Sequence, residues 1–383
     1  MKNYMNVILH RILTFSQVRG IITYKSIFTA YLKYEEDGMI QFVEKREFSV
    51  IGLGEVMLRL SPGGSERITH SETFEKHAGG SELNVVSGVA QLGLRTGIIT
   101  KLPHSEIGKF ARRRIRYCGV SDDLVIYDRA PSARLGIYYY ESGAYPRLPT
   151  VFYDRAHSSF TALSAEELPE SVFYSTQIFH TSGITMALSE QVRTSAIQIL
   201  RRFSEAGATV SFDVNYRASL WDEVSARREI EKILPYAHVL FISEETLRRM
   251  FDMSGELSDI QRRFHSSFPN LRVIASTRRR VTSPHKHSFS SLVYDCDTGE
   301  HFEEAPYEGI DVVDRIGSGD AYVAGALYGL LAHSSIREMA LYGDAMAALK
   351  MTVLGDTAEC DISDIDRIIS AGTDSGPKSE MIR

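Results

Sequence analysis

Short runs of apolar and β-branched residues recur along the middle of the chain and predict the strands of one sheet. Each run has the usual length of a buried strand, and polar or small residues bound it on both sides. Amphipathic helical patterns separate several of the runs. The predicted strands cover residues 48–53, 96–102, 177–180, 208–212, 239–242 and 272–276.

The clearest helical pattern covers residues 190–206. Ser189 is the expected N-cap of this helix, and Gly207 is expected to end it in the left-handed conformation. Apolar side chains spaced three and four residues apart form the stripe that faces the core, namely Val192, Ala196, Ile199, Leu200 and Phe203. Because alternating strands and helices are typical of a mostly parallel sheet, we expect an α/β fold with helices on both faces of a central sheet.

Two segments, residues 57–76 and 134–153, interrupt this alternation and are predicted to form hairpins. The second of them is rich in tyrosine. Hairpins that extend from an α/β core form a lid over a binding site, or an edge that pairs with a second copy of the chain. We therefore expect a small β lid from about residues 57–76 and 134–156, and a homo-oligomer.

Residues 1–47 differ in composition from the rest of the chain. The first 34 residues hold no acidic side chain, although basic residues recur among them. Three interpretations fit this composition: a targeting segment, translated upstream sequence before a true start at Met39, or a short docking helix. We expect the folded domain to cover residues 48–371 and residues 372–383 to form a flexible tail.

The overall composition narrows the possible partners. The chain has 383 residues, 43% of them hydrophobic, and a formal net charge of −6, so it can bury a large core and lacks a basic excess for nucleic acid. No apolar run reaches the roughly 20 residues of a membrane span. Cys118, Cys296 and Cys360 form no C-x-x-C pair, which favours a reducing compartment without structural zinc. We expect a cytoplasmic protein without a nucleic-acid or membrane partner.

Polar side chains follow three of the predicted strands. Because the carboxyl ends of parallel strands meet at one edge of a sheet, where ligands bind, these side chains are expected to share a site. The alternative is that these loops are polar only because solvent surrounds them. The side chains are Asp213, Asn215 and Arg217 after one strand, Ser243, Glu244 and Glu245 after the next, and Thr277 and Arg278 after the third.

The segment 314–331, with the sequence DRIGSGDAYVAGALYGLL, carries the most specific signal. The small residues Gly317, Ser318 and Gly319 precede a helix whose N-terminus carries partial positive charge. Backbone N–H groups that converge in such a turn bind phosphate. Asp320 in the first turn either favours the helix dipole or accepts the proton of a hydroxyl that attacks phosphorus. In either role, we expect the dipole to lower its pKa.

This segment resembles the C-terminal signature of the ribokinase-like (PfkB) carbohydrate kinases, in which small residues precede a catalytic aspartate. The stretch GGSELN at residues 79–84 resembles the family's second signature, and the likeness extends over residues 48–371. The resemblance implies a mostly parallel central sheet between helices, with a small β lid. It also implies ATP as the phosphoryl donor with Mg²⁺, Asp320 as the catalytic base, and the backbone of Gly317, Ser318 and Gly319 as an anion hole.

Within the family, the likeness is greatest to sugar-acid kinases, the 2-keto-3-deoxygluconate kinases. The shared stretches are DRIGSGD, in which Arg315 is the second residue, GIYYYESG and DVNYR. A sugar acid needs a cation for its carboxylate, and the resemblance implies Arg217, followed by Arg155, in that role. The alternatives are a surface ion pair for each arginine and a packing role for each tyrosine. The other implied substrate contacts are Gly80, Asn84, Tyr138, Tyr140 and Asp356.

The nucleotide site departs from the family pattern at two places. Residues 243–246 are SEET where many members have N-x-x-E, which leaves Glu244 or Glu245 to hold magnesium through water. Residues 277–280 are TRRR in place of a Gly-rich loop, and this run either clamps the triphosphate or forms a solvated turn. The resemblance places ATP contacts at Asn215, Ser243, Thr277, Arg280, Gly317, Gly319, Asp344 and Ala347, and ligands of a monovalent cation at Asp311 and Val313.

These departures keep two other functions open beside the main prediction of a sugar-acid kinase. One is a kinase for a neutral sugar such as fructose or ribose, in which Arg217 faces away from the acceptor. The other is a catalytically weakened sugar-binding or regulatory protein. The missing N-x-x-E motif favours this last function, and the retained residues 317–320 argue against it.

Overall fold

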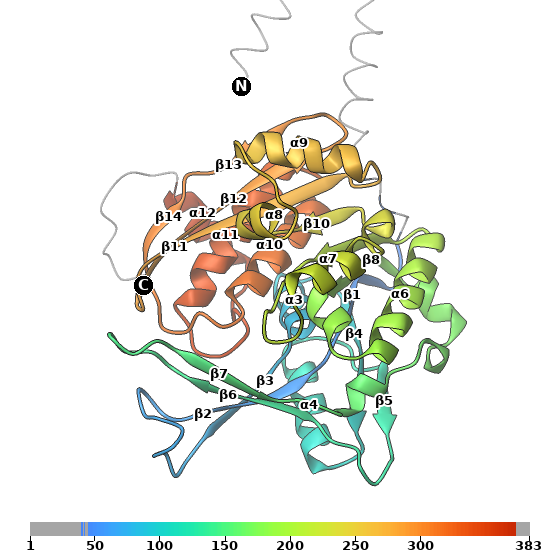
Figure 1. The fold of residues 1–383 in the computed structure, drawn as a ribbon, viewed down its shortest axis with the longest axis vertical. Coiled ribbons are helices and arrows are strands. Elements are labelled where there is room, and N and C mark those ends of the chain that lie inside the picture. The colour runs from blue at the N-terminus through green and yellow to red at the C-terminus, as the bar shows by residue number, and fades with distance from the viewer. Residues whose placement is uncertain (1–39, 41, 43–44, 373–383) are drawn as a thin grey trace, which may run out of the picture. The chain divides into compact units, whose positions relative to one another are not determined.

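The computed structural model describes residues 40, 42 and 45–372, so the predictions for the N-terminal extension and the C-terminal tail lie almost entirely outside the described residues. A ten-stranded sheet forms the centre of the domain (Figure 1), in the order β13-β12-β11-β10-β9-β8-β1-β4-β5 with β14 paired to β12. The path from β11 to β5 is parallel, whereas β12, β13 and β14 pair antiparallel. The strands are β1 (Phe48–Leu53), β4 (Thr96–Pro103), β5 (Val125–Asp128), β8 (Thr176–Ser182), β9 (Thr209–Asp213), β10 (Val239–Phe241), β11 (Val273–Ser283), β12 (Lys286–Asp295), β13 (His301–Glu303) and β14 (Tyr307–Asp311).

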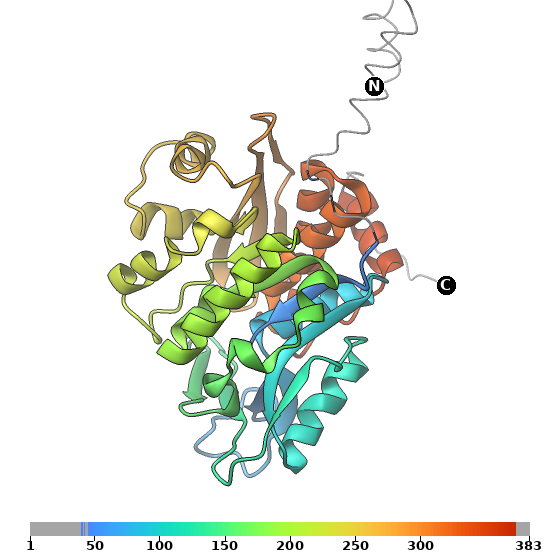
Figure 2. The same ribbon diagram turned by 90° about the vertical axis from the view of Figure 1, so that its right-hand side faces the viewer.

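Helices cover both faces of this sheet (Figure 2). The helices α3, α10 and α11 pack together on one face, and α6 to α9 lie on the other. The prediction of an α/β fold with a mostly parallel sheet is therefore confirmed. The helices are α3 (Ser81–Gln91), α4 (Glu106–Tyr117), α5 (Gly183–Ala187), α6 (Glu190–Glu205), α7 (Glu223–Ile230), α8 (Glu244–Arg249), α9 (Leu257–Ser267), α10 (Ser318–His333), α11 (Ile336–Met351) and α12 (Ile362–Gly372), with short 3₁₀ turns at Ser159–Ala162, Ala165–Glu167, Glu170–Tyr174 and Leu234–Tyr236.

A second, four-stranded sheet forms the predicted lid (Figure 1). Its strands are β2 (Met57–Ser61), β3 (Glu75–Gly79), β6 (Gly136–Glu141) and β7 (Thr150–Asp154), in the order β3-β2-β6-β7. The two predicted hairpins are the antiparallel pairs β2–β3 and β6–β7, and the parallel pairing of β2 with β6 joins them. The homo-oligomer expected from such a lid stays a prediction.

Local sequence signals set the ends of α6 as expected. The Ser189 hydroxyl accepts a hydrogen bond from the Val192 N–H at 3.1 Å, which satisfies one of the free donors of the first turn. Gly207 follows the helix with a φ of +81°, a conformation that glycine adopts without strain. The apolar stripe of this helix packs into the main core with Phe173, Phe179 and Phe212.

Close helix packing fixes the position of α10, the helix that follows the glycine-rich segment. A Cβ atom at Gly325 would lie 2.3 Å from the Tyr342 carbonyl oxygen, so only glycine allows α10 and α11 to approach this closely. Gly88 of α3 faces Ala324 in the same way, because a Cβ atom at Gly88 would lie 2.6 Å from the Ala324 methyl group. The small residues therefore hold the N-terminus of α10 rigidly beside α3.

In the part of the chain that the structure describes, no helix is both long and apolar enough to cross a membrane. Cys118, Cys296 and Cys360 are free cysteines. The cytoplasmic location inferred from cysteine usage stays a prediction.

Candidate active site

A cavity of about 1170 Å³ lies between the lid and the carboxyl ends of the main-sheet strands. Its volume exceeds that of most sites for a single small molecule, so it has room for two. The sequence predicts that polar residues after three strands share one site, and the structure brings all of them to this cavity: Asp213, Asn215, Arg217, Ser243, Glu244, Glu245, Thr277 and Arg278.

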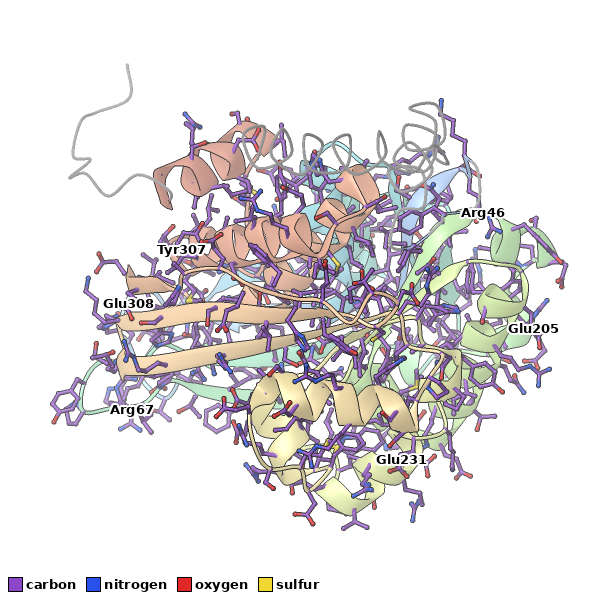
Figure 3. All side chains as sticks on the ribbon, turned by 90° about the horizontal axis from the view of Figure 1, so that it is seen from above. Arg46, Arg67, Glu205, Glu231, Tyr307 and Glu308 are labelled. Atoms are coloured by element: carbon purple, nitrogen blue, oxygen red, sulfur yellow. The ribbon has the colours of Figure 1, made fainter. Side chains whose placement is uncertain are left out.

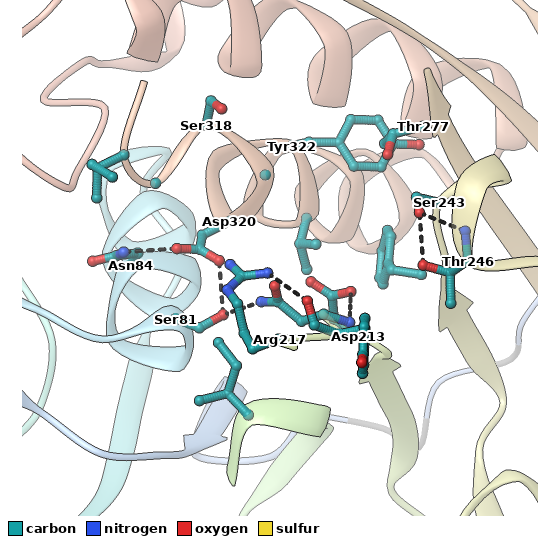
Figure 4. Close-up of a pocket in the computed structure, with 18 of the residues that line it drawn as sticks. Ser81, Asn84, Asp213, Arg217, Ser243, Thr246, Thr277, Ser318, Asp320 and Tyr322 are labelled. Carbon is teal, nitrogen blue, oxygen red and sulfur yellow. Dashed lines mark hydrogen bonds between the residues drawn. The ribbon is translucent and has the colours of Figure 1, made fainter. Parts of the chain in front are cut away.

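Asp320 lies in the first turn of α10 and lines this cavity (Figure 4). One carboxylate oxygen accepts a hydrogen bond from the Ser81 hydroxyl and the other accepts one from the Asn84 amide, each at 2.7 Å. The Asn215 amide donates to the Ser81 hydroxyl at 2.8 Å, which orients that hydroxyl. The first turn of α3 therefore fixes the Asp320 carboxylate while leaving oxygen lone pairs free for a ligand.

The pKa of Asp320 shifts in the direction opposite to our expectation. Burial raises the pKa of this carboxyl, and the hydrogen bonds from Asn84 and Ser81 and the charge of Arg217 offset only part of the rise. The helix dipole was expected to lower the pKa, but desolvation dominates because the side chain is almost fully covered. A higher pKa makes the carboxylate a stronger base, which suits proton transfer better than a dipole contact alone.

The turn before Asp320 requires glycine at one position. Gly317 has a φ of +80°, and a Cβ there would lie 1.9 Å from the Asp356 carbonyl oxygen. Gly319, by contrast, has open space where a Cβ would lie. The first N–H groups of a helix have no carbonyl before them to bond, although the Ser318 N–H makes a long 3.3 Å bond to the Arg315 carbonyl. All three residues of the turn line the cavity, and their role as an anion hole stays a prediction.

A buried ion network that the sequence did not reveal joins the lid to this turn. Arg59 of β2 donates to Asp314 at 2.6 Å and to Asp356 at 3.0 Å, and all three side chains are buried. The Tyr138 hydroxyl donates to the other oxygen of Asp356. Although burial lowers the pKa of Arg59, the charges of Asp356 and Asp314 more than offset it and raise the pKa. The only sequence signal was a basic residue inside the apolar stretch 57–60.

The predicted substrate contacts divide into those that line the cavity and one that does not. Gly80, Asn84, Tyr138, Arg155, Arg217 and Asp356 line it. Tyr140 does not, contrary to the prediction, because it lies two residues farther along β6 and its ring packs 4.5 Å from the Arg59 guanidinium. Tyr153 of β7, which we did not predict, lines the cavity instead.

The two candidate carboxylate-binding arginines differ in their partners. Arg155 donates to the buried Glu55 at 2.8 Å, so its charge is already balanced. Arg217 is exposed to the cavity, and within the described residues its guanidinium donates a hydrogen bond to the neutral Tyr216 carbonyl. Its charge lowers the pKa of both Asp320 and Asp213, and its guanidinium lies beside the Asp320 carboxylate (Figure 4). Arg217 is therefore the more available cation.

Three of the predicted ATP contacts lie away from the cavity. Arg280 points to Glu308, which it contacts at 3.1 Å near the outer edge of the molecule (Figure 3). Asp344 is buried, where it accepts a hydrogen bond from the Ser291 N–H, and Ala347 is buried on the same helix. Both residues lie on α11, which packs against α10 and β12, and their role at the nucleotide stays a prediction. The other predicted contacts, Asn215, Ser243, Thr277, Gly317 and Gly319, line the cavity.

The run of arginines after Thr277 is not a solvated turn. Residues 278–280 continue β11 and pair with β12 over their whole length, so the strand extends well past its predicted end at Ser276. Arg278 and Arg279 line the cavity, and Arg278 contacts Glu244 and Glu303 at 2.6 Å.

Acidic side chains in the cavity do not form a ready-made metal centre. The described residues contain no group of three metal-ligating side chains. Glu244 is engaged by Arg248 and Arg278, and Glu245 by Arg249. Asp213 has no such cation partner among the described residues, and burial together with the charge of Asp320 raises its pKa to about 7. Since Mg²⁺ binds mainly through phosphates and water, one such carboxylate fits a magnesium ion that enters with a nucleotide.

The predicted monovalent-cation ligands lie before the turn. Asp311 is exposed and contacts Lys286 at 2.6 Å, and Val313 is exposed as well. Neither residue lines the cavity. A role for them in cation binding stays a prediction.

Comparison with known proteins identifies the family. The model of the pfkB family carbohydrate kinases matches residues 47–362. The chain belongs to this family. The 2-dehydro-3-deoxygalactonokinase of Haloferax volcanii is 34% identical over 323 residues, which cover 84% of this chain and 97% of that one. The solved structure of the 2-dehydro-3-deoxygluconokinase of Thermotoga maritima has a TM-score of 0.80 and 32% identity, and covers 84% of this chain and 99% of its own.

A third relative, the 2-dehydro-3-deoxygluconokinase of Bacillus subtilis, is 28% identical and covers 74% of this chain and 83% of its own length. The resemblance inferred from the two sequence signatures is therefore confirmed, and so is the ribokinase-like fold. Kinases that are named for 2-keto-3-deoxy sugar acids are among the relatives of this carbohydrate kinase.

Proposed function

We propose that this carbohydrate kinase transfers the terminal phosphoryl group of ATP to the terminal hydroxyl of a 2-keto-3-deoxy sugar acid. The substrate is 2-keto-3-deoxygluconate or its galacto epimer, and the product is the 6-phosphate. The names of the relatives supply this substrate class. The observation that carries the proposal is the position of Arg217, an available cation in the same cavity as the Asp320 carboxylate.

Asp320 acts as the general base. Its oxygens are fixed by Ser81 and Asn84, and a substrate hydroxyl donates a hydrogen bond to a remaining lone pair. As the hydroxyl oxygen bonds to phosphorus, its proton moves to the carboxylate, whose pKa is raised by burial. The backbone donors of residues 317–319 face the negative charge that grows on the phosphoryl oxygens.

Other residues bind and orient the two substrates. Arg217 pairs with the carboxylate of the sugar acid, and Asn84 and Tyr138 contact its hydroxyls from the core and the lid. The nucleotide occupies the side of the cavity lined by Ser243 and Thr277. Mg²⁺ that arrives with ATP would neutralise charge on the phosphates, and Asp213, which lines the cavity without an ion pair among the described residues, would hold it. The lid excludes water, which limits wasteful hydrolysis of ATP.

The test is a coupled ADP-release assay with Mg-ATP and a panel of acceptors. The panel holds 2-keto-3-deoxygluconate, 2-keto-3-deoxygalactonate, gluconate, fructose and ribose. We expect turnover on one or both keto-acids, and a KM for that acid that is higher by about 10- to 100-fold in Arg217→Gln, because a charge-assisted pair is worth about 1.5–3 kcal/mol.

Arg193→Gln serves as the control variant because Arg193 does not line the cavity. Turnover on fructose or ribose alone, with Arg217→Gln unaffected, would replace the sugar-acid proposal by a neutral-sugar kinase. Saturable sugar binding without turnover would support the regulatory alternative.

A further inference from the structure

The arginines that line the cavity form two groups. Each guanidinium of the first group is balanced by a carboxylate, in the pairs Arg155–Glu55, Arg248–Glu244, Arg278–Glu244 and Arg249–Glu245. The second group consists of Arg217, Arg279 and Arg315, for which the described part of the chain supplies no ion pair. These three guanidinium groups line the cavity without an ion-pair partner among the described residues, so they are available to bind an anionic ligand.

Arg217 differs from the other two members of this group. Its charge acts on both Asp320 and Asp213, so acidic neighbours compensate it in part. Arg279 has only a weak attraction to Glu245, which already contacts Arg249. The described residues therefore leave Arg279 and Arg315 as the least compensated cations of the cavity.

Both guanidinium groups line the same cavity as Gly317, Ser318 and Gly319. Arg279 is exposed to the cavity, and desolvation, followed by repulsion from Arg315 and then from Arg217, lowers its pKa. Their positions in the fold are defined by different elements. Arg279 lies on β11 opposite Phe289 of β12, two residues after Thr277, and Arg315 lies two residues before Gly317. The two cations thus reach one cavity, Arg279 from the β11–β12 hairpin and Arg315 from the segment before the glycine turn.

We propose that Arg279 and Arg315 together bind the terminal phosphates of the donor nucleotide, as a side-chain clamp beside the backbone donors of residues 317–319. A polyphosphate is the ligand class that fits, because it carries several charges and offers pairs of oxygens to planar guanidinium groups. Arg315 adjoins the turn, so it contacts the phosphoryl group that is transferred. Arg279 contacts the phosphate that remains on ADP. This inference rests on the proposed function only for the direction of transfer.

The clamp explains how the site works without the family's N-x-x-E motif. The two arginine side chains neutralise the part of the phosphate charge that magnesium leaves uncompensated. Ligand binding also removes the repulsion between them, so part of the binding energy comes from relief of that repulsion. Arg280, the next residue on β11, takes no part because it points to Glu308.

The test compares Arg279→Gln and Arg315→Gln with the matched control Arg280→Gln, which removes the same charge from the same strand. Binding of inorganic tripolyphosphate and of adenosine is measured by calorimetry, and steady-state kinetics are measured with Mg-ATP. We expect each of the first two variants to bind tripolyphosphate at least about 10-fold more weakly, since a charge-assisted hydrogen bond is lost. Adenosine binding should stay unchanged in all three, which shows that the site remains folded.

The kinetic expectation separates the two residues. Arg315→Gln should lower kcat by about 10²–10³-fold, as removal of a donor to transition-state charge does, and Arg279→Gln should mainly raise the KM for ATP. Arg315→Lys should recover part of the tripolyphosphate affinity because it restores the charge.

Tripolyphosphate affinities of Arg279→Gln and Arg315→Gln equal to that of Arg280→Gln would overturn the inference, and so would a wild-type protein that does not bind tripolyphosphate. Weakened tripolyphosphate binding in a protein that phosphorylates no sugar acid would uphold the clamp and refute the proposed substrate. The two failures are therefore distinguishable.

Discussion

Replacement of Arg59 by methionine tests whether the buried ion network holds the lid strand β2 to the glycine turn before α10. Methionine has a similar length and no charge, so the variant keeps most of the apolar packing and removes only the cation. Asp314 and Asp356 then lose their shared partner, with side chains only 1% and 2% exposed. Breaking a buried pair in this way costs about 3–5 kcal/mol.

The surroundings set the expected cost within that range. Lys350 is buried nearby, donates to the Asp314 carbonyl at 2.9 Å, and its charge acts on both aspartates. It compensates part of the lost charge, so we expect the lower end, about 3 kcal/mol. Arg280→Met is the matched control, because its pair with Glu308 is exposed and should contribute roughly 0–1 kcal/mol.

The destabilisation should also depend on pH. Without the guanidinium, the two buried carboxylates lack a partner whenever they are ionised, and a lower pH reduces this cost because it favours their neutral form. A carboxyl with a raised folded-state pKa contributes stability at low pH that is lost as the pH rises through that pKa. Arg59 stays charged throughout in the wild type because its pKa is raised. The deficit of the variant should therefore be smaller at pH 5 than at pH 8.

The assay is guanidinium unfolding followed by circular dichroism, for wild type, Arg59→Met and Arg280→Met at both pH values. A loss for Arg59→Met no larger than that of Arg280→Met would refute the reasoning. A deficit that shrinks as the pH rises would show that the unpaired aspartates are not its cause.

Two further predictions concern the catalytic turn. Ser81→Ala removes a hydrogen bond that lowers the pKa of Asp320. In a pH profile of kcat/KM, the acid limb, where the protonated base is inactive, should therefore move to higher pH. An acid limb that does not move would contradict this prediction. Gly317→Ala places a Cβ 1.9 Å from the Asp356 carbonyl oxygen at a φ of +80°, so this variant should have a lower melting temperature and no turnover. Gly319→Ala has open space for its Cβ and should have the melting temperature of the wild type. Equal melting temperatures for the two variants would count against a strained turn.

Sequence reasoning located the features of the site that depend on local chain geometry. Gly317 is predictable because a tight turn before a helix favours glycine, and its positive φ bears this out. The polar residues after successive strands are assigned to one site because parallel strands end at one edge, and they line one cavity. The first inference uses the conformational preference of glycine, and the second uses the common edge at which parallel strands end.

Features that depend on distant residues were missed or misplaced. Arg59 and Asp356 are 297 positions apart, and no local pattern links them. The resemblance placed Arg280 at the nucleotide, whereas pairing with β12 continues β11 past Ser276, so that Arg279 lines the cavity and Arg280 contacts Glu308. The predicted direction of the Asp320 pKa shift was wrong for a related reason. The desolvation that raises this pKa comes from the surrounding fold rather than from the helix that carries Asp320.

The measurement that tests the account most directly is the turnover of Asp320→Asn with Mg-ATP and the keto-acid that the wild type phosphorylates. Asparagine has the same shape but cannot accept the proton, so we expect kcat to fall by about 10²–10⁴-fold while tripolyphosphate binding and the melting temperature are kept. A variant that retains kcat within about tenfold of the wild type would show that Asp320 is not the base, and would contradict the account.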